Sequence, residues 1–264
     1  MVFEVRIILT ASLHNLQRHT SYESFAEVLY VMCGRFSITT APEAMRAIFN
    51  YENMPNLEPR FNVAPTQPII TIRLDEKSAR LLVAARWGLI PAWSKDGNSA
   101  VRMINARADT LLEKPSFREA FKKRRCLIPA DGFYEWRVEK GQKQPFRIGM
   151  KGGDVFAFAG LWESWEAKQN GYGYEEGDVV ETVTIVTTDA NDKLRPIHNR
   201  MPVILPPETY SAWLNPANDV STCQNFLKPY SAEPMAFYRV GQIVNNARND
   251  DPRCVEPKSL SKSV

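Results

Sequence analysis

The sequence has few of the residues that build metal sites and disulfide frameworks. It holds four cysteines and three histidines in 264 residues, and no two cysteines form a CxxC pair. A zinc site or a disulfide framework is therefore not expected, and we predict neither a metal nor a cofactor. Unpaired, scattered cysteines are typical of a reducing compartment. They are Cys33, Cys126, Cys223 and Cys254.

Long apolar runs, flexible linkers and repeats are also missing. No run approaches the roughly 18 to 20 apolar residues that a membrane span needs, so we predict no membrane association. No Gly/Ser-rich or low-complexity tract interrupts the chain between about residue 33 and residue 245, which predicts one main domain. The net charge of +3 is modest, so any nucleic-acid site must come from local clustering of cations. We expect a cytoplasmic monomer, associated with the nucleoid if its source is bacterial.

Short runs rich in β-branched and aromatic residues dominate the rest of the chain. Many strands with few helical crossovers predict an α+β fold, a curled, largely antiparallel, barrel-like β-sheet flanked by short helices. The segment 60–65 is predicted to be a loop. Strands are expected over 69–74, 81–89, 126–138, 145–149, 155–165, 181–188 and 235–240, and helices over 42–50, 116–124, 207–214 and 222–227.

The two ends of the chain differ from the domain between them. Residues 1–31 make a poor signal peptide, because Glu4 and Arg6 interrupt the apolar start. They are a translated upstream extension, a removable pro-segment, or the result of a wrongly assigned start codon; we favour the last, with Met32 as initiator. The domain is predicted over 32–245, and the polar, proline-containing residues 246–264 are predicted to be a loose tail.

Cys33 follows Met32 directly and precedes Gly34. If Met32 initiates translation and is removed, Cys33 carries an α-amine and a thiol on adjacent carbons. An α-amine has a pKa near 7.7–8.0, so roughly a tenth or more is free base at pH 7. Such an amine condenses with an aldehyde to an imine, and the thiol then closes a thiazolidine ring. The alternative is an inert, buried structural cysteine.

Six segments, in order along the chain, resemble the SRAP family, the SOS-response-associated peptidases that are also called abasic-site processing proteins. The resemblance covers residues from about 33 to 250, and the collinear set is specific although no single segment is. The segments are 32–36 (MCGRF), 60–65 (RFNVAP), 87–93 (WGLIPAW), 104–110 (INARADT), 129–136 (PADGFYEW) and 197–202 (IHNRMP).

The resemblance implies a function in the DNA-damage (SOS) response. It implies binding of single-stranded DNA and a lyase-like enzyme that joins an N-terminal cysteine to the C1′ aldehyde of an abasic site as a thiazolidine crosslink. It also implies a self-processing peptidase step that exposes the cysteine. The family positions map onto Cys33 as nucleophile, Asn105 as a polar positioning group, and Glu135 and His198 as acid/base groups.

These roles are chemically reasonable for the residues concerned. Glu135 lies in an apolar, aromatic run, where partial burial would raise its pKa toward neutrality; the alternative is a strand carboxylate that faces solvent. His198 is the only histidine outside residues 1–31 and could protonate the sugar ring oxygen, although a lone histidine is often structural. Asn105 could equally be an ordinary turn residue.

DNA contact would need cations and stacking groups beside these residues. Arg35, Arg107 and Arg200 each lie within two residues of a proposed catalytic group, where guanidinium groups could bind flanking phosphates. Trp93 and Pro65 could stack on or wedge against bases. A basic patch could contact DNA or be a solvated helix face; its residues are Lys114, Arg118, Lys122, Lys123, Arg124 and Arg125.

Three other functions stay open. N-terminal-nucleophile hydrolases such as class II glutamine amidotransferases also begin with Met-Cys-Gly, but they continue with a small aliphatic residue and glycine, where this chain has Arg35 and Phe36. A peptidase that cleaves other proteins is the second. A non-enzymatic single-strand binder is the third, and it predicts that Cys33→Ala holds an abasic strand as durably as the parent.

Overall fold

Two largely antiparallel sheets form the framework of the computed structural model, which describes residues 33–258. The first sheet has the strand order β13-β8-β7-β1-β2, and the second has the order β11-β10-β4-β3-β6-β9-β12, with β5 paired to β10. The first comprises β1 (Phe36–Ile38), β2 (Arg60–Val63), β7 (Gly132–Glu139), β8 (Gln142–Met150) and β13 (Met235–Arg239). The second comprises β3 (Pro68–Leu74), β4 (Arg80–Trp87), β5 (Asn105–Arg107), β6 (Arg125–Ala130), β9 (Phe156–Glu166), β10 (Val179–Asp189), β11 (Arg200–Pro202) and β12 (Ile204–Leu205).

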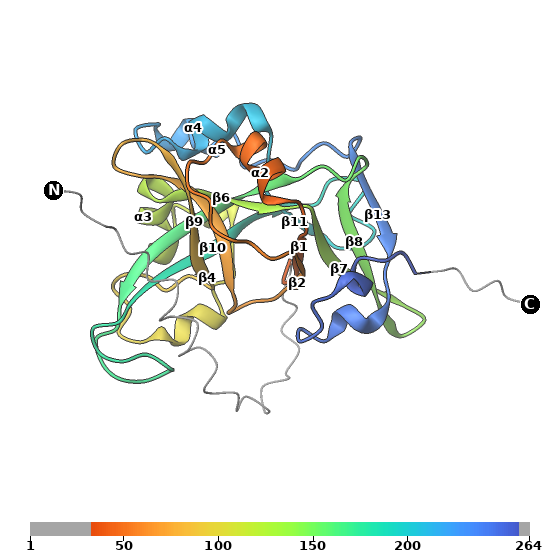
Figure 1. The fold of residues 1–264 in the computed structure, drawn as a ribbon, viewed down its shortest axis with the longest axis horizontal. Coiled ribbons are helices and arrows are strands. Elements are labelled where there is room, and N and C mark those ends of the chain that lie inside the picture. Colours follow the sequence, from red (N-terminus) through yellow and green to blue (C-terminus); the bar gives the residue numbers. More distant parts are fainter. Residues whose placement is uncertain (1–32, 259–264) are drawn as a thin grey trace, which may run out of the picture.

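Short helices lie around the sheets, with α2, α4 and α5 along one edge (Figure 1). Both α2 and α3 begin with a proline, whose fixed φ suits the first helical turn. None of the helices among the described residues has the length and apolar character that crossing a bilayer requires. The α-helices are α2 (Pro42–Phe49), α3 (Pro115–Lys123), α4 (Tyr210–Leu214) and α5 (Val220–Gln224); the 3₁₀ turns are η1 (Gly97–Val101), η2 (Ala108–Thr110), η3 (Pro207–Thr209), η4 (Gln242–Asn245) and η5 (Pro252–Cys254).

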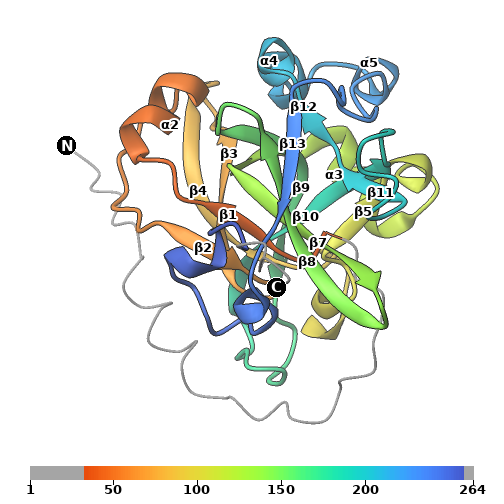
Figure 2. The same cartoon turned by 90° about the vertical axis from the view of Figure 1, so that its right-hand side faces the viewer.

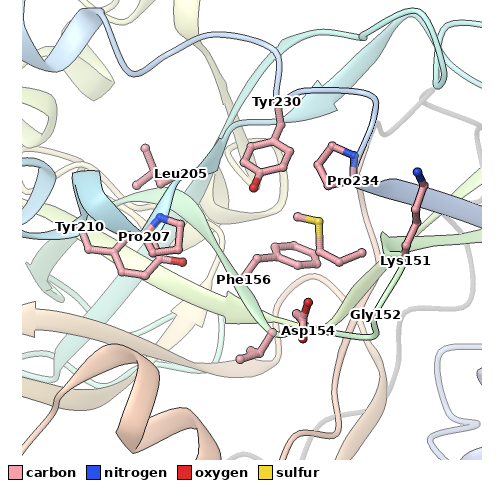
Figure 3. A pocket seen from close by; sticks show the side chains of 11 residues that line it. Lys151, Gly152, Asp154, Phe156, Leu205, Pro207, Tyr210, Tyr230 and Pro234 are labelled. Carbon is pink, nitrogen blue, oxygen red and sulfur yellow. The ribbon is translucent and has the colours of Figure 1, made fainter.

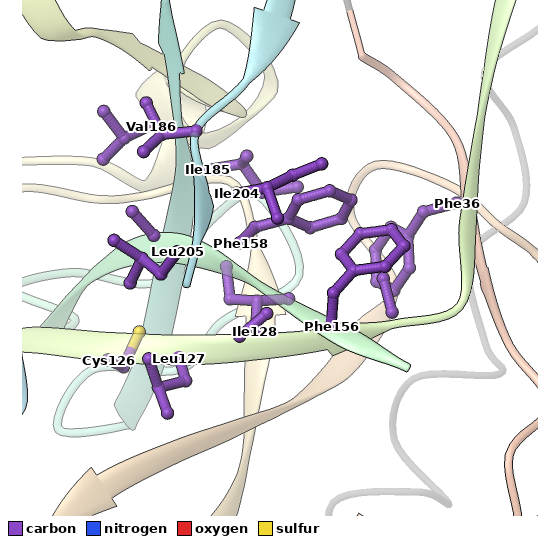
Figure 4. Close-up of a cluster of buried hydrophobic side chains, with 14 of the residues drawn as sticks. Phe36, Cys126, Leu127, Ile128, Phe156, Phe158, Ile185, Val186, Ile204 and Leu205 are labelled. Carbon is purple, nitrogen blue, oxygen red and sulfur yellow. The ribbon is translucent and has the colours of Figure 1, made fainter. Parts of the chain in front are cut away.

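Aromatic side chains from both sheets meet in the main core (Figure 4). Phe158 of β9 contacts Phe36 of β1 and Phe133 of β7 edge to face, with ring centroids 5.9 and 6.0 Å apart. Phe36 also meets Trp87 of β4 at 5.3 Å. Because these rings are closely packed, β1 and β7 of the first sheet are fixed in position against β4 and β9 of the second sheet.

The predicted α+β fold with curled, largely antiparallel sheets is confirmed, and most predicted elements match observed ones. The single strand expected over 126–138 is wrong, because the chain turns at Asp131 and passes from β6 in the second sheet to β7 in the first. Asp131 is buried, accepts a hydrogen bond from Ser37 Oγ at 2.7 Å and pairs with Arg147 at 2.9 Å. A Cβ on Gly132 would come within 2.5 Å of the Arg147 guanidinium, so a larger residue at this corner would displace the Arg147 side chain.

The loop predicted over 60–65 is wrong, because residues 60–63 form strand β2. Residues 246–258 of the predicted tail pack against the domain, and the remainder, 259–264, lies outside the described residues. Asp250 accepts hydrogen bonds from the backbone N–H groups of Phe61 and Asn62 at 2.5 and 2.9 Å. Cys254 is fully buried. Strand β2 is an edge strand of the first sheet, and the C-terminal segment supplies acceptors for its backbone N–H groups on the unpaired edge.

Candidate active site

Cys33 and Glu135 lie in direct contact. Cys33 stands just before β1, which pairs antiparallel with β7, the strand that carries Glu135. The backbone nitrogen of Cys33 donates a hydrogen bond to Glu135 Oε1 at 2.7 Å. Only 2% of Cys33 and 4% of Glu135 are exposed. A carboxyl group is thus placed, away from water, at the nitrogen that would become the α-amine.

Cys33 also has an unusual backbone conformation. Its φ of 47° lies in the left-handed region that residues with a Cβ rarely adopt. Such a conformation persists only when the surrounding contacts impose it, and it is frequent at functional sites.

The environment changes the acidity of both groups. Burial raises the pKa of Glu135, while the nearby charge of His198 and the hydrogen bonds from Cys33 act in the opposite direction. Burial and the neighbouring Glu135 also raise the pKa of the Cys33 thiol well above its usual value, against a smaller opposing effect from Arg200. The site therefore favours a neutral thiol beside a carboxyl that can hold a proton nearer to neutral pH.

His198 and Arg200 approach this pair from the segment that leads into β11. The backbone N–H of Arg200 donates to His198 Nδ1 at 3.1 Å, which assigns the proton of the neutral ring to Nε2. The Arg200 guanidinium is 6% exposed and donates to the carbonyl and hydroxyl oxygens of Thr187 at 2.8 and 3.0 Å. Burial, helped by the charge of Arg107, lowers the pKa of Arg200. The hydrogen bonds to Thr187 of β10 therefore hold the Arg200 guanidinium in place.

Asn105 and Arg107 lie on β5, on the other side of the same stretch of β10. Thr187 of β10 pairs with Arg107 on one side and with Pro202 of β11 on the other. Figure 2 shows β5 and β11 near each other beside β10. Arg107 is exposed and binds Asp109, whose hydrogen bonds raise the pKa of Arg107. Cys33, Glu135, His198 and Arg200 therefore lie near one another in the structure. Strand β5, with Asn105 and Arg107, lies beside them.

Arg35, which we expected to contact DNA, has several protein partners. Its guanidinium donates to Asn62 Oδ1 at 3.0 Å and to the carbonyl oxygens of Val244 and Asn245 at 2.7 and 3.2 Å. Burial lowers the pKa of Arg35. These contacts connect the start of β1 to β2 and to the C-terminal segment.

Pro65 and Trp93 lie in two loops that are joined to each other. Thr66 N donates to Trp87 O, and Trp87 N donates to Gln67 O, both at 2.9 Å, so the loop after β2 runs beside the end of β4. Pro65 is half-buried, whereas Trp93 is 67% exposed. Most of the Trp93 side chain is therefore open to solvent.

The basic patch is smaller in the structure than in the sequence. Arg125 is buried and donates to the carbonyl oxygens of Phe121 and Trp213, each at 2.7 Å. Arg124 pairs with Glu163 at 2.7 Å. Two of the six predicted cations thus stabilise the fold, and the exposed ones are Lys114, Arg118 and Lys123.

A hollow of 410 Å³ lies apart from these residues (Figure 3). None of the predicted site residues contributes to it. Its lining includes Phe156, Tyr210 and Tyr230, from β9, α4 and the segment before β13. The candidate site is therefore defined by side-chain contacts around Cys33 rather than by this hollow.

Sequence reasoning missed several residues that build the site. Thr187 fixes Arg200, and no pattern around it distinguishes it from an ordinary strand residue. Asn62 and Asp131 lie inside the recognised segments, so the segments themselves could have indicated them. Asp250 gave no signal, because its partners are 188 to 190 residues away in the sequence.

The fold and the site define a protein equipped for chemistry at a buried cysteine whose nitrogen contacts a protonatable carboxyl group. Residues 32–247 match the family described as SOS response associated peptidase (SRAP), and the chain belongs to this family. The resemblance seen in the sequence is confirmed.

Relatives in bacteria and animals are similar over most of the chain. The abasic site processing protein YoqW of Bacillus subtilis is 45% identical over 230 residues, covering 85% of this chain and 99% of the relative. The abasic site processing protein HMCES of Pongo abelii is 34% identical over 240 residues, covering 76% and 66%. A crystal structure of a protein from Bacteroides thetaiotaomicron superimposes with a TM-score of 0.76 at 30% identity, covering 86% of this chain and all of that one.

Proposed function

We propose that the protein processes abasic sites in single-stranded DNA, and that Cys33, as the N-terminal residue, forms a thiazolidine crosslink with the C1′ aldehyde. The observation that supports this most directly is the 2.7 Å hydrogen bond from the Cys33 nitrogen to Glu135 Oε1. It puts an acid/base group on the atom whose proton transfers limit imine chemistry. The named relatives process abasic sites, which is consistent with the proposal.

The reaction would proceed in three steps. The free-base amine of Cys33 attacks the aldehyde carbon and forms a carbinolamine. Protonated Glu135 then donates its proton to the hydroxyl group, so that water leaves and a protonated imine forms. The thiol adds its sulfur to the imine carbon while its proton passes to the Glu135 carboxylate, which closes the ring with the net loss of one water and restores the protonated carboxyl group.

His198 would act before these steps. An abasic sugar is mostly a closed hemiacetal, and opening it requires a proton on the ring oxygen and removal of one from the C1′ hydroxyl. Because Nδ1 accepts from the Arg200 backbone, Nε2 is the atom that can carry that proton. Asn105 would orient the opened sugar from β5.

DNA would run past β5 and β11. Arg107 is exposed, and Arg200 lies near enough to Cys33 to oppose the rise in the pKa of its thiol, so the two would neutralise phosphates on either side of the lesion. Trp93 and Pro65 would stack against adjacent bases. Arg35 and Arg200 are weaker candidates for phosphate contacts than Arg107, because both are more buried and their donors already have protein acceptors. We expect the protein to work as a monomer in the cytoplasm.

Self-processing is a second activity that the same contact favours. In a chain that retains residues 1–32, the Cys33 nitrogen belongs to the peptide bond after Met32. The thiol would attack the Met32 carbonyl, and Glu135 would protonate the departing nitrogen, leaving a thioester. Water would then hydrolyse the thioester, releasing residues 1–32 and the free α-amine. An intact mass that never falls during incubation of the long form would contradict this step.

The crosslink is tested with an abasic oligonucleotide on a heated denaturing gel. Protein that begins at Met32 should form a heat-stable adduct after loss of the methionine. The Cys33→Ala variant should not, whereas Cys223→Ala, which changes a buried cysteine in α5, should behave like the parent. Uncleaved 264-residue protein should bind single-stranded DNA without forming the adduct, because its Cys33 nitrogen is an amide.

The outcome that would overturn the proposal is an equally stable adduct from the long form, with residues 1–32 shown by intact mass to be retained. In that case the α-amine of Cys33 could not be the nucleophile.

A further inference from the structure

A second, smaller core lies beneath the loop that carries Trp93. It consists of four buried residues, with Tyr174 and Val180 packed against them. Two of the four belong to the segment between β4 and β5, which carries Trp93. The other two belong to the hairpin that β9 and β10 form. The four are Ile90, Ala100, Trp165 and Ala167.

Trp165 makes the polar contact between hairpin and loop. Its indole Nε1 donates to the carbonyl oxygen of Ser94 at 2.8 Å, and its side chain is 2% exposed. Ser94 is the residue directly after Trp93. The hydrogen bond therefore fixes the peptide unit between Ser94 and Lys95, one residue beyond the exposed indole.

Tyr174 supports the same contact from the far end of the hairpin. Its ring meets Trp165 edge to face, with centroids 5.2 Å apart. A Cβ on Gly97 would come within 2.7 Å of that ring, so a larger residue at position 97 would push the tyrosine ring away from the loop. On the other side of the loop, Ile90 N donates to Thr182 Oγ1 at 3.0 Å. The loop is thus held at both ends by β9, β10 and their connection.

We propose that Trp165 is a positioning residue for DNA binding, which holds the Trp93 loop in the conformation that receives a base. The proposal rests on the proposed function, because it takes single-stranded DNA as the ligand of Trp93. An exposed aromatic side chain on a free loop would lose conformational entropy on stacking. A loop already fixed by Trp165 and Tyr174 avoids most of that cost.

Replacing Trp165 by phenylalanine tests the contact. The variant keeps an aromatic ring in the small core but removes the donor to Ser94 O. We expect the dissociation constant for a single-stranded oligonucleotide, measured by fluorescence anisotropy, to rise about three- to tenfold, the effect of losing roughly one hydrogen bond. The maximal rate of adduct formation at saturating abasic DNA should not change, because Cys33 and Glu135 are untouched.

Trp213 provides a matched control. It is also fully buried, and its Nε1 donates to Cys126 O at 2.9 Å, but it lies in α4 among the main-core residues. Trp213→Phe makes the same chemical change and should leave the dissociation constant as it is in the parent. Tyr174→Leu, which removes the ring that packs on Trp165, should weaken binding in the same direction as Trp165→Phe.

A double-mutant cycle separates positioning from a general structural role. In a Trp93→Ala background, Trp165→Phe should have no further effect on DNA affinity, since the group that it positions is gone. The proposal is overturned if Trp165→Phe binds DNA like the parent, or if it weakens binding by the same factor with and without Trp93.

Failure of the proposed crosslink would look different. A parent that binds single-stranded DNA but forms no heat-stable adduct would refute the crosslinking chemistry, while the binding comparison between Trp165→Phe and Trp213→Phe would still decide the role of Trp165. A parent that does not bind single-stranded DNA would overturn both proposals.

Discussion

Glu135→Gln should separate proton transfer from geometry at the Cys33 nitrogen. The amide has nearly the shape of the carboxyl group, and its Oε1 can still accept the hydrogen bond that Glu135 accepts at 2.7 Å. It cannot exchange a proton with the carbinolamine or the imine. General acid–base catalysis contributes about 10²- to 10⁴-fold in rate, which corresponds to roughly 3 to 5 kcal/mol in the barrier.

The assay is single-turnover adduct formation by protein that begins at Met32, at saturating abasic DNA. We expect the rate to fall by about 10²- to 10⁴-fold, while equilibrium binding of single-stranded DNA stays within about twofold of the parent. Glu163→Gln is the matched control: Glu163 is also buried, burial also raises its pKa, and it lies in β9, where it pairs with Arg124. Its adduct rate should equal that of the parent.

Stability can be measured separately in the 264-residue form, where the Cys33 nitrogen is an amide. Burial raises the pKa of Glu135, so the folded protein keeps the proton at pH values where the unfolded chain has released it. This stabilising contribution is complete below the unfolded pKa and is lost as the pH rises through the folded pKa.

The parent therefore loses stability between the unfolded and the folded pKa of Glu135, whereas Glu135→Gln does not. The free energy of unfolding of Glu135→Gln, relative to that of the parent, should rise over this pH interval. A slower reaction at neutral pH cannot then come from unfolding. An adduct rate for Glu135→Gln within about threefold of the parent would refute the assignment of Glu135 as the proton carrier.

Two other predictions concern the surroundings of the site. Asn62→Ala removes the hydrogen bonds of Asn62 Nδ2 to the carbonyl oxygens of Val244, Asn246 and Asn249, and that of Arg35 to Asn62 Oδ1. It should lower the free energy of unfolding by about 2 to 4 kcal/mol in a denaturant titration, and an unchanged midpoint would show that the C-terminal segment is not held by this residue. Arg107→Ala and Arg200→Ala should each weaken single-strand binding and reduce the slope of log K against log salt by about 0.7; a slope equal to that of the parent would exclude a phosphate contact.

The sequence predicted most strands correctly because those signals are local. Runs of β-branched and aromatic residues predict β3, β8 and β10, and the carboxyl group of Glu135 stands out in an apolar run. The corner at Asp131 was missed, since an uninterrupted apolar run does not show that a chain changes sheets. The hydrogen bonds of Ser37 and Arg147 that stabilise this corner come from distant parts of the sequence.

The sequence did not show which of the clustered cations are exposed. A run of cations in the sequence does not show which guanidinium groups turn inward, and Arg125 satisfies four carbonyl oxygens that only the folded chain brings together. Arg35 is a similar case. Carbonyl groups that lie 209 and 210 residues away in the sequence decide its role, and no local pattern contains that information.

The contact between Cys33 and Glu135 depends on these distant interactions. Strand β1 has three residues and forms only two register pairs with β7, so the ladder ends before it reaches Cys33. Beyond it, Tyr134 N donates to Arg35 O at 3.0 Å, and the Arg35 guanidinium binds Asn62 and the C-terminal segment. A short strand alone would fray, and the left-handed conformation of Cys33 would relax with it. Asn62 and the η4 residues Val244 and Asn245, to which we assign no catalytic role, therefore help to hold the Cys33 nitrogen against the carboxyl group of Glu135.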